Sequence, residues 1–342
     1  MSDVMSEAPL TEQLDQAIEA LLRNPGAAAS PENIELDELF NIAVQLVTSL
    51  PREQFKTDLR TEIEKEISMN TAVEAAPTVK KSTTANPVRE GFRTVTPYLT
   101  VPDIYSEIEF ITKVFGAEGQ VYGLGSAGGY HSEYRIGDSM LMIGGGGGKS
   151  KWKGSPVPSS LHLYVEDVDA AYERALQGGA ISLMPPTDMD YGERGAGIQD
   201  VGGNHWYLAT ATGPTYVPEG AHNLMPYMNP VGAQKMIEFL KQGFGAEEVD
   251  KHQSPDGIVH HAKVRIVDSI IEMGEAHGQW QPRPMTFMLY VDDCDVWYAR
   301  AMKAEGAVSM GEPANAPYGG RTGTVKDPFD NTWYISGPVR VP

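Results

Sequence analysis

Three histidines and a glutamate in the middle of the chain could carry acid–base chemistry. His131 and Glu133 lie in YHSEYRI, His162 lies in SLHLY and His205 lies in HWYLAT, all short β-rich segments. Residues two apart in a strand share a face, so His131 and Glu133 should point the same way. Imidazole and carboxylate groups act as general acid and base near neutral pH, and three histidines with a carboxylate also suffice for an unconventional metal site. The alternative is that these side chains lie on different strands and hydrogen-bond to tyrosines or water.

A second group of charged residues lies further along the chain, in VHHAKVRI and SIIEM. A tight hairpin between these segments should place Lys263 opposite Glu272, and an opposite charge lowers the cost of burying either group. His261 shares a face with Lys263, whereas the adjacent His260 must point to the other side. We therefore expect an ion pair with one histidine beside it.

Both groups belong to a long internal repeat, which decides the architecture. Residues 94–210 contain TVTPYLTVPD, RIGDSMLMIG, LHLYVEDVDAAYERA, YGER and NHWYLAT, and residues 223–337 contain NLMPYMNP, RIVDSIIEMG, FMLYVDDCDVWYARA, YGGR and NTWYISG. The second copy has Met288 in place of His162 and Thr332 in place of His205. Any acid–base catalysis is therefore expected in the first copy rather than the second.

Each copy is itself built from two shorter repeats. In the first copy, the phrases around Val101, Asp103 and Gly116 return around Val165, Asp167 and Gly179. Each quarter is expected to form a strand, a helix and three more strands. In the first quarter the helix IYSEIEFITKVFGAE should end at Gly116, and Gly137-Asp138 should form the tight turn of a hairpin.

This βαβββ unit, used four times, resembles the vicinal oxygen chelate superfamily, also called the glyoxalase/bleomycin resistance protein/dioxygenase superfamily. The phrases TPYLTV, FGAE, RIGDSMLMIGG, LHLYVEDVDA and DPFDNTWYIS are most similar to its PhnB-like branch. The resemblance covers residues 92–338 and implies an α+β fold with two glyoxalase-like domains, residues 92–213 and 214–342. It leaves the activity open, because the superfamily includes isomerases, ring-cleaving dioxygenases, thiol transferases and drug-binding proteins without catalysis.

In the metal-dependent members, the resemblance implies His, Gln or Glu ligands on the first and last strands of each unit. The matching positions in this chain are Thr96, Met142, Ser160 and Tyr207 in the first copy and Met225, Glu272, Thr286 and Tyr334 in the second. Only Glu272 among them is a good ligand for a divalent ion. The usual metal cofactor is therefore not expected, and a divalent ion in an unconventional site is the alternative.

Strand alternation around these positions predicts what lines each cavity. The first cavity is expected to contain the candidate catalytic residues His131, Glu133, His162 and His205, and the candidate ligand-binding residues Tyr98, Tyr164 and Tyr207. The second is expected to contain the candidate ligand-binding residues Tyr227, His261, Lys263, Glu272, Tyr290 and Tyr334.

Two tyrosine–arginine pairs recur before a late strand of each copy. Tyr191 and Arg194 lie in YGER, and Tyr318 and Arg321 lie in YGGR. Arginine at this place could clamp a carboxylate or phosphate of a ligand. The alternative is an arginine that braces its own loop and packs on tyrosine.

The glycine run Gly144–Gly148 is followed by three lysines and Trp152. It approaches the spacing of a phosphate-binding loop, but such a loop must join a strand to a helix, and KWKGSPVP is no helix. We predict a mobile flap over the cavity, with Trp152 as a lid.

The first part of the chain has a different character. Residues 1–68 are predicted to form an α-helical module, since LTEQLDQAIEALLRN carries apolar residues at helical spacing. Residues 69–91 lack such periodicity and are predicted to be a flexible linker. The helices are expected to dock onto a protein partner or onto the repeats.

Composition and charge exclude several classes of partner. The net charge of −19 argues against nucleic acid or an anionic membrane as a partner. A single cysteine, Cys294, allows no internal disulfide and fits a reducing compartment. With no long apolar run and no signal peptide apparent, we expect a cytoplasmic protein, either a monomer or a homodimer.

Three functions are compatible with this sequence. The tyrosine- and methionine-rich cavities favour a protein that binds a small molecule, aromatic or cationic, without catalysis. The histidines favour a lyase, isomerase or dioxygenase, with a metal or by acid–base chemistry alone. The third function is a ligand sensor that signals to a partner through the N-terminal helices. We expect small-molecule binding, and the sequence leaves open whether the bound molecule is also converted.

Overall fold

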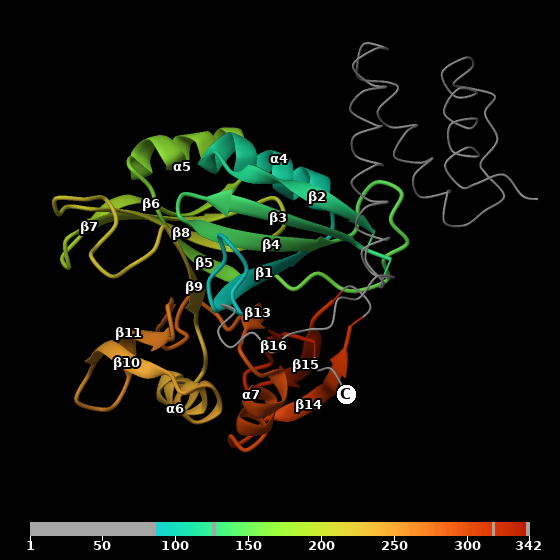
Figure 1. Cartoon of the computed structure of the whole chain (residues 1–342). Coiled ribbons are helices and arrows are strands. Elements are labelled where there is room, and N and C mark those ends of the chain that lie inside the picture. Colours follow the sequence, from blue (N-terminus) through green and yellow to red (C-terminus); the bar gives the residue numbers. More distant parts are fainter. Residues whose placement is uncertain (1–86, 125–127, 317–318, 340–342) are drawn as a thin grey trace, which may run out of the picture. The chain divides into compact units, whose positions relative to one another are not determined.

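The structure, a computed structural model, describes residues 87–124, 128–316 and 319–339, all within the unit Ala85–Pro342 (Figure 1). Element labels follow Figure 1 and begin at β1 and α4. The predicted helical module 1–68, most of the predicted linker 69–91 and the candidate residue Tyr318 lie outside the described residues.

The first copy of the repeat forms two βαβββ units, as the sequence predicts. The first unit consists of β1 (Val95–Val101), α4 (Ile104–Phe115), β2 (Glu118–Leu124), β3 (Tyr130–Ile136) and β4 (Ser139–Gly145). The second consists of β5 (Ser160–Tyr164), α5 (Val168–Gln177), β6 (Ile181–Met189), β7 (Glu193–Gln199) and β8 (His205–Ala211).

The second copy repeats this order. Its first unit consists of β9 (Leu224–Met228), α6 (Ala233–Phe244), β10 (Glu247–Gln253), β11 (Val259–Ile266) and β12 (Ser269–Met273). Its second unit consists of β13 (Thr286–Tyr290), α7 (Cys294–Ala301), β14 (Val308–Asn315), β15 (Arg321–Lys326) and β16 (Thr332–Gly337). The α+β fold of four βαβββ units is confirmed.

Local sequence signals explain where the helices begin and end. The side chain of Asp103 accepts hydrogen bonds from backbone N–H groups at the start of α4, and Asp167 and Asp293 do the same for α5 and α7. Helix α4 ends at Gly116, as predicted, with the glycine in the left-handed conformation at φ 66°. Aspartate caps therefore start three of the four helices, and the F-G-A motif ends α4 and α6, whereas α6 begins at Gly232 without a side-chain cap.

The four units form two eight-stranded sheets, and each sheet takes one unit from each copy. The strand orders are β14-β15-β16-β13-β1-β4-β3-β2 and β10-β11-β12-β9-β5-β8-β7-β6. The two copies join where β1 pairs with β13 and β5 pairs with β9, both antiparallel. The expectation that units of one copy share a cavity is therefore wrong, because β1 and β5, the first strands of the two units in one copy, lie in different sheets.

Within each copy the two units instead pack through their helices. Helix α4 contacts α5, and α6 contacts α7 (Figure 1). Phe115 packs on Trp206 at 4.8 Å between ring centroids, and Phe244 packs on Trp333 at 4.6 Å. The apolar side of every sheet is thus buried under helices, and the alternate residues of each strand face the other, helix-free side.

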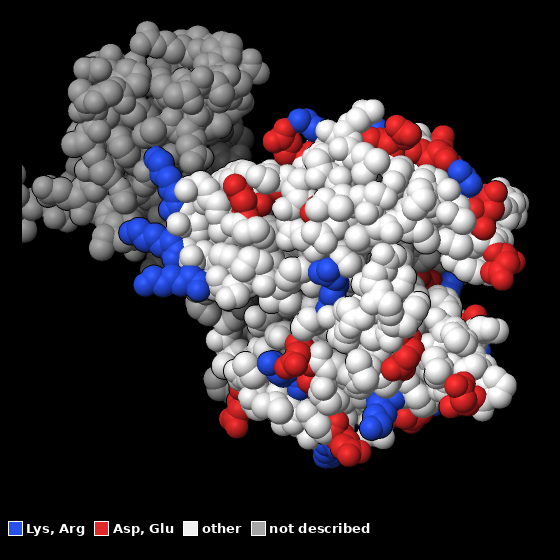
Figure 2. All heavy atoms as spheres, turned by 180° about the vertical axis from the view of Figure 1, so that it is seen from behind, with Lys and Arg blue, Asp and Glu red and all other residues white. Residues whose placement is uncertain are grey.

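Charged side chains of both signs are scattered over the surface of the described unit seen in Figure 2. Among the described residues, no helix is long and apolar enough to cross a membrane.

Candidate functional site

A buried carboxylate lies at the centre of the helix-free side of the second sheet, which we call the Glu272 face. Glu272 has no exposed surface, and its Oε2 atom is hydrogen-bonded to Nδ1 of His162. The Nζ atom of Lys263 lies 3.0 Å from Oε1 of Glu272, which confirms the predicted cross-hairpin ion pair. The angle of this contact is poor for a hydrogen bond, so Oε1 keeps its capacity to accept one. His162 comes from the first copy, and Glu272 and Lys263 come from the second.

Charge and burial act in opposite directions on this carboxylate. Burial by itself would raise the pKa of Glu272, but the interactions with His162, His261 and Lys263 lower that pKa well below its usual value. His261 contributes from 4.0 Å, and about a third of its side chain is exposed. Glu272 is therefore ionised, and the groups around it are held in place by its charge.

Aromatic rings extend from this carboxylate across the same face. Tyr227 packs against Tyr207 at 4.5 Å between centroids, and Tyr207 packs against Trp280 at 4.6 Å, with the rings tilted by 36° and 41°. Trp280 comes from the connection between β12 and β13 and lies against Gly197, where any side chain would meet the indole ring. Aromatic surfaces of this kind bind planar ligands by stacking.

A tyrosine and a second carboxylate lie towards the other end of the Glu272 face. Tyr164 donates a hydrogen bond of 2.5 Å from its hydroxyl to Glu193. Burial, together with the nearby charges of Glu272 and Glu193, raises the pKa of Tyr164. This hydroxyl therefore stays protonated as a donor, and the ring itself is almost fully buried. Tyr191, in the turn before β7, is largely exposed, so its ring lines no enclosed cavity.

His205 and Arg283 mark the end of the face next to Trp280. The Nη2 atom of Arg283 lies 2.5 Å from Nε2 of His205, and Nη1 donates to the carbonyl of Gly203 at 3.1 Å. Burial, followed by the charge of Arg283, lowers the pKa of His205 to about 4. His205 is therefore neutral at physiological pH and accepts the hydrogen bond from the guanidinium.

His131 and Glu133 lie on the helix-free side of the other sheet, which we call the Glu133 face. The hydroxyl of Tyr98 is 3.1 Å from Nδ1 of His131, and Nε2 of His131 is 3.3 Å from Oε1 of Glu133. The predicted first cavity is therefore corrected: His131 and Glu133 are separated from His162 and His205, because β3 and β5 belong to different sheets.

The segment before β1 occupies part of the Glu133 face. Arg89 donates two hydrogen bonds to Glu133, at 2.5 and 2.8 Å, and one to the hydroxyl of Tyr290 at 3.3 Å. Burial would raise the pKa of Glu133, but the bonds from His131 and Arg89 lower it to about 2. Tyr334 lies on this same face, beside Met288 in the strand register. The predicted second cavity is corrected too, because Tyr290 and Tyr334 lie in a different sheet from Glu272.

The two recurring arginines turn away from these faces. Arg194 pairs with Asp169 of α5 and with Asp188, and Arg321 pairs with Asp295 of α7. Both side chains lie on the helix side of their sheets. These ion pairs favour the structural brace over the ligand clamp as the role of both arginines.

Sequence reasoning missed two residues that border the Glu272 face, Trp280 and Arg283. A signal was present, because Trp280 occupies the place in the second copy that Trp152 occupies in the first. The ring of Trp152 packs against Gly129 and Gly146, whereas Trp280 contacts predicted site residues. Arg283 has no counterpart that would have drawn attention to it.

The residues at the family's ligand positions do not fit a divalent ion. In the second sheet these positions bring together Ser160, Tyr207, Met225 and Glu272. Lys263 already neutralises the single carboxylate, that of Glu272. The other three positions offer a hydroxyl, a phenol and a thioether, which are poor ligands for a divalent ion. Among the described residues, no group of three or more His, Cys, Asp or Glu side chains is arranged to hold a metal.

Comparisons with solved structures agree with this architecture. Glyoxalase I from maize (Zea mays) is 14% identical to this chain, with a TM-score of 0.55 over 71% of this chain and 92% of the maize chain. At this identity, the likeness concerns the fold alone.

Comparisons of sequence identify the family. The model of the Glyoxalase/Bleomycin resistance protein/Dioxygenase superfamily matches residues 229–335. An uncharacterized protein of Mycobacterium bovis is 35% identical over 123 residues, which are 33% of this chain and 80% of that protein. An uncharacterized protein of Mycobacterium tuberculosis has the same identity, over 72% of its length. The chain belongs to the glyoxalase/bleomycin resistance protein/dioxygenase superfamily.

Proposed function

We propose that this protein binds a small organic molecule on the Glu272 face. The observation that carries the proposal is buried Glu272, paired with His162 and Lys263, beside the adjoining rings of Tyr207 and Tyr227. Small-molecule sites combine aromatic walls with a few well-placed polar groups, and this face has both.

Each part of the face has a distinct role in this proposal. Tyr207, Tyr227 and Trp280 provide a surface on which a planar molecule stacks. Lys263 and His261 are partly exposed, at 24% and 34% of their side chains, so they can reach a polar group of the ligand. Glu272 fixes their positions, which lowers the entropy lost on binding.

The Glu133 face is the weaker candidate for the same role. At the positions that correspond to Glu272 and His162 it carries Met142 and Met288, which offer no strong hydrogen-bonding group. Its carboxylate is already paired by Arg89 of the segment before β1. A ligand there would have to displace this pair.

Acid–base catalysis by a lyase or isomerase is the second candidate, and the hydrogen bond between His162 and Glu272 favours it. A carboxylate that orients an imidazole is the arrangement used in general acid–base catalysis. The two candidates differ in the fate of the bound molecule: a binding protein releases it unchanged, and an enzyme converts it.

Indole signals in nuclear magnetic resonance test the proposal, because the chain has five tryptophans. Trp280 borders the Glu272 face, and Trp152, its counterpart in the first copy, provides a matched control inside the same molecule. Catechol, an oxygenated aromatic probe, is expected to shift the Trp280 indole N–H signal and leave that of Trp152 unchanged. A shift at Trp152 alone, or no shift with catechol or any other aromatic fragment, would contradict the proposal.

A further inference from the structure

Glu133 occupies the place on its own face that Lys263 occupies on the Glu272 face, because the repeat aligns the two residues. Lys263 has the carboxylate of Glu272 opposite it in the neighbouring strand. Glu133 has only uncharged residues opposite it, Gln120 on β2 and Met142 on β4, although it is itself only 5% exposed. The sheet therefore supplies no permanent cation to this buried carboxylate.

A segment outside the sheet supplies the cation instead. Arg89 donates hydrogen bonds from its two terminal nitrogens to the two oxygens of Glu133, at 2.5 and 2.8 Å, and a third to the hydroxyl of Tyr290 at 3.3 Å. The guanidinium carbon of Arg89 lies 4.4 Å from the centre of the Phe92 ring. A carboxylate that accepts both arms of a guanidinium, a further polar group and an aromatic ring are the features by which proteins recognise guanidinium and amidinium groups.

The turn that carries Arg89 recurs in the second copy without the arginine, because VREGFR in the first copy returns as VPEGAH. In the first copy, the N–H of Phe92 donates to the carbonyl of Arg89 at 3.0 Å. In the second, the N–H of Ala221 donates to the carbonyl of Pro218 at 3.1 Å, so the same turn forms. Arg89 is therefore not needed to build the turn. Its side chain is 48% exposed and can leave Glu133 without breaking a hydrogen bond between strands.

We propose that the Glu133 face is a binding site for a guanidinium or amidinium cation, and that Arg89 occupies this site as an internal ligand. An external cation of this class replaces the guanidinium of Arg89 on Glu133 and Tyr290. The site is closed while Arg89 is paired and open when its side chain leaves. This inference stands on the Glu133 face and does not rest on the function proposed for the Glu272 face.

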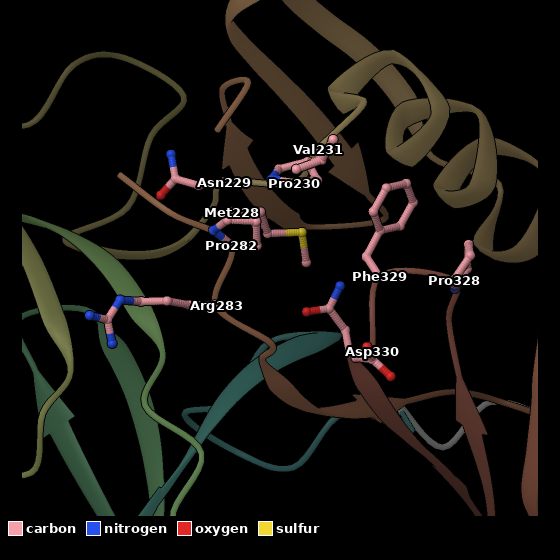
Figure 3. Close-up of a pocket in the computed structure, with 10 residues that line it drawn as sticks. Met228, Asn229, Pro230, Val231, Pro282, Arg283, Pro328, Phe329 and Asp330 are labelled. Atoms are coloured by element: carbon pink, nitrogen blue, oxygen red, sulfur yellow. The ribbon is translucent and has the colours of Figure 1, made fainter. Parts of the chain in front are cut away.

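The enclosed pocket of about 260 Å³ shown in Figure 3 offers such a cation no comparable carboxylate. Asp330 is the one acidic residue among those that line the pocket, and Nζ of Lys326 pairs with its carboxylate at 3.0 Å. The side chain of Arg283 points away from the other lining residues in Figure 3. A cationic probe is therefore expected on the Glu133 face rather than in this pocket.

Benzamidine is the probe, and benzamide is its neutral counterpart of the same shape. The full chain is titrated with each, and binding is followed by calorimetry. In Arg89→Ala, benzamidine should bind about tenfold or more tightly than benzamide, because the amide forms no charged hydrogen bond with Glu133. In the unmodified chain the benzamidine affinity should be lower by about tenfold or more, because Arg89 competes for the site. Adding Glu133→Gln to Arg89→Ala should remove the gain.

Three further variants serve as controls. Arg93→Ala removes an arginine of the same segment that pairs with Asp138, and it should not raise the benzamidine affinity. Asp330→Asn, combined with Arg89→Ala, should leave the affinity unchanged. Arg89→Pro introduces the residue that the second copy carries at this place, so it keeps the turn and should act as Arg89→Ala does. It provides the same test if the alanine variant does not fold.

Several results would overturn the inference. They are equal benzamidine affinities in the unmodified chain and in Arg89→Ala, equal affinities of Arg89→Ala for benzamidine and benzamide, and an affinity that survives Glu133→Gln. Loss of binding in Asp330→Asn would place the probe in the pocket of Figure 3, and no binding up to about 10 mM would leave the face without a site. Failure of the proposed function is recognised separately, because catechol and the Trp280 signal report on the other sheet.

Discussion

The ion pair of Lys263 with Glu272 is the residue-scale feature on which the Glu272 face depends. Glu272 is fully buried, and the side chain of Lys263 is only 24% exposed. Lys263→Met should lower the free energy of unfolding by about 3 kcal/mol, because it leaves a buried carboxylate without its cation. Urea denaturation of the variant and of the unmodified chain measures this difference.

A double variant separates the charge effect from simple packing. Lys263→Met combined with Glu272→Met places at position 272 the residue that the Glu133 face carries at Met142. Replacing both partners by apolar groups should recover most of the lost stability. If the double variant is as unstable as Lys263→Met alone, the unpaired buried charge is not the cause of the lost stability.

His205 provides a pH-dependent test at the same scale. Its pKa of about 4 lies below that of an unfolded histidine, so the unfolded chain takes up a proton first as the pH falls. His205 should therefore destabilise the fold progressively from about pH 6.5 down to pH 4. Titration of the imidazole by magnetic resonance should show the low pKa, and Arg283→Gln should raise it. A pKa near 6.5 in the unmodified chain would contradict the placement of Arg283 beside it.

The elements themselves could be predicted because each is encoded locally. Aspartate caps, Gly116 and the Gly137-Asp138 turn fix the boundaries of helix and hairpin within a few residues of sequence. The hairpin of β11 and β12 is also local in the sequence, which is why the contact between Lys263 and Glu272 could be predicted. The pairing of β1 with β13 and of β5 with β9 could not be predicted from the sequence. All four units present the same kind of edge strand, and the repeated sequence carries no signal for which edges pair.

The contact between α4 and the second unit has its own pH dependence. Glu107 of α4 is fully buried near Asp200, and its carboxyl oxygens have no hydrogen-bond partner of good geometry among the described residues. Burial, and then the charge of Asp200, raise the pKa of Glu107 well above its usual value. Its contribution to stability is therefore present below the unfolded-state pKa and is lost as the pH rises through the folded-state pKa.

Glu107→Met tests this contact, because buried Met236 is the matching residue of α6. The melting temperature of the variant should exceed that of the unmodified chain at pH 8, and the difference should shrink at pH 5. Glu109→Gln removes an exposed carboxylate of the same helix and is the control. A difference that stays constant between pH 5 and pH 8 would contradict the raised pKa.

At the scale of the described repeats, the two copies do not form separate domains, because each sheet contains one unit from each copy. The hydrogen bond between His162 and Glu272 therefore joins residues 110 positions apart in the sequence. The candidate site could not be assembled from the sequence for this reason. Its residues were recognised by type and by face, and only the structure shows which of them meet.

Separation of the copies tests this arrangement. Residues 87–213 alone would expose the edges of β1 and β5, and residues 214–342 would expose those of β9 and β13. Each fragment should therefore self-associate or precipitate, and the two together should form a one-to-one complex. Size-exclusion chromatography with light scattering distinguishes this from two independently folded monomers, which would contradict the observed strand pairing.

Native mass spectrometry of the full chain tests the central claim, that a small molecule binds on the Glu272 face, most directly. The comparison is between the unmodified chain, Tyr207→Ala on the Glu272 face and the matched Tyr334→Ala on the Glu133 face. We predict that a bound organic molecule, co-purified or added, is seen in the unmodified chain and in Tyr334→Ala and is lost in Tyr207→Ala. Retention in Tyr207→Ala with loss in Tyr334→Ala would place binding on the other sheet and contradict the account.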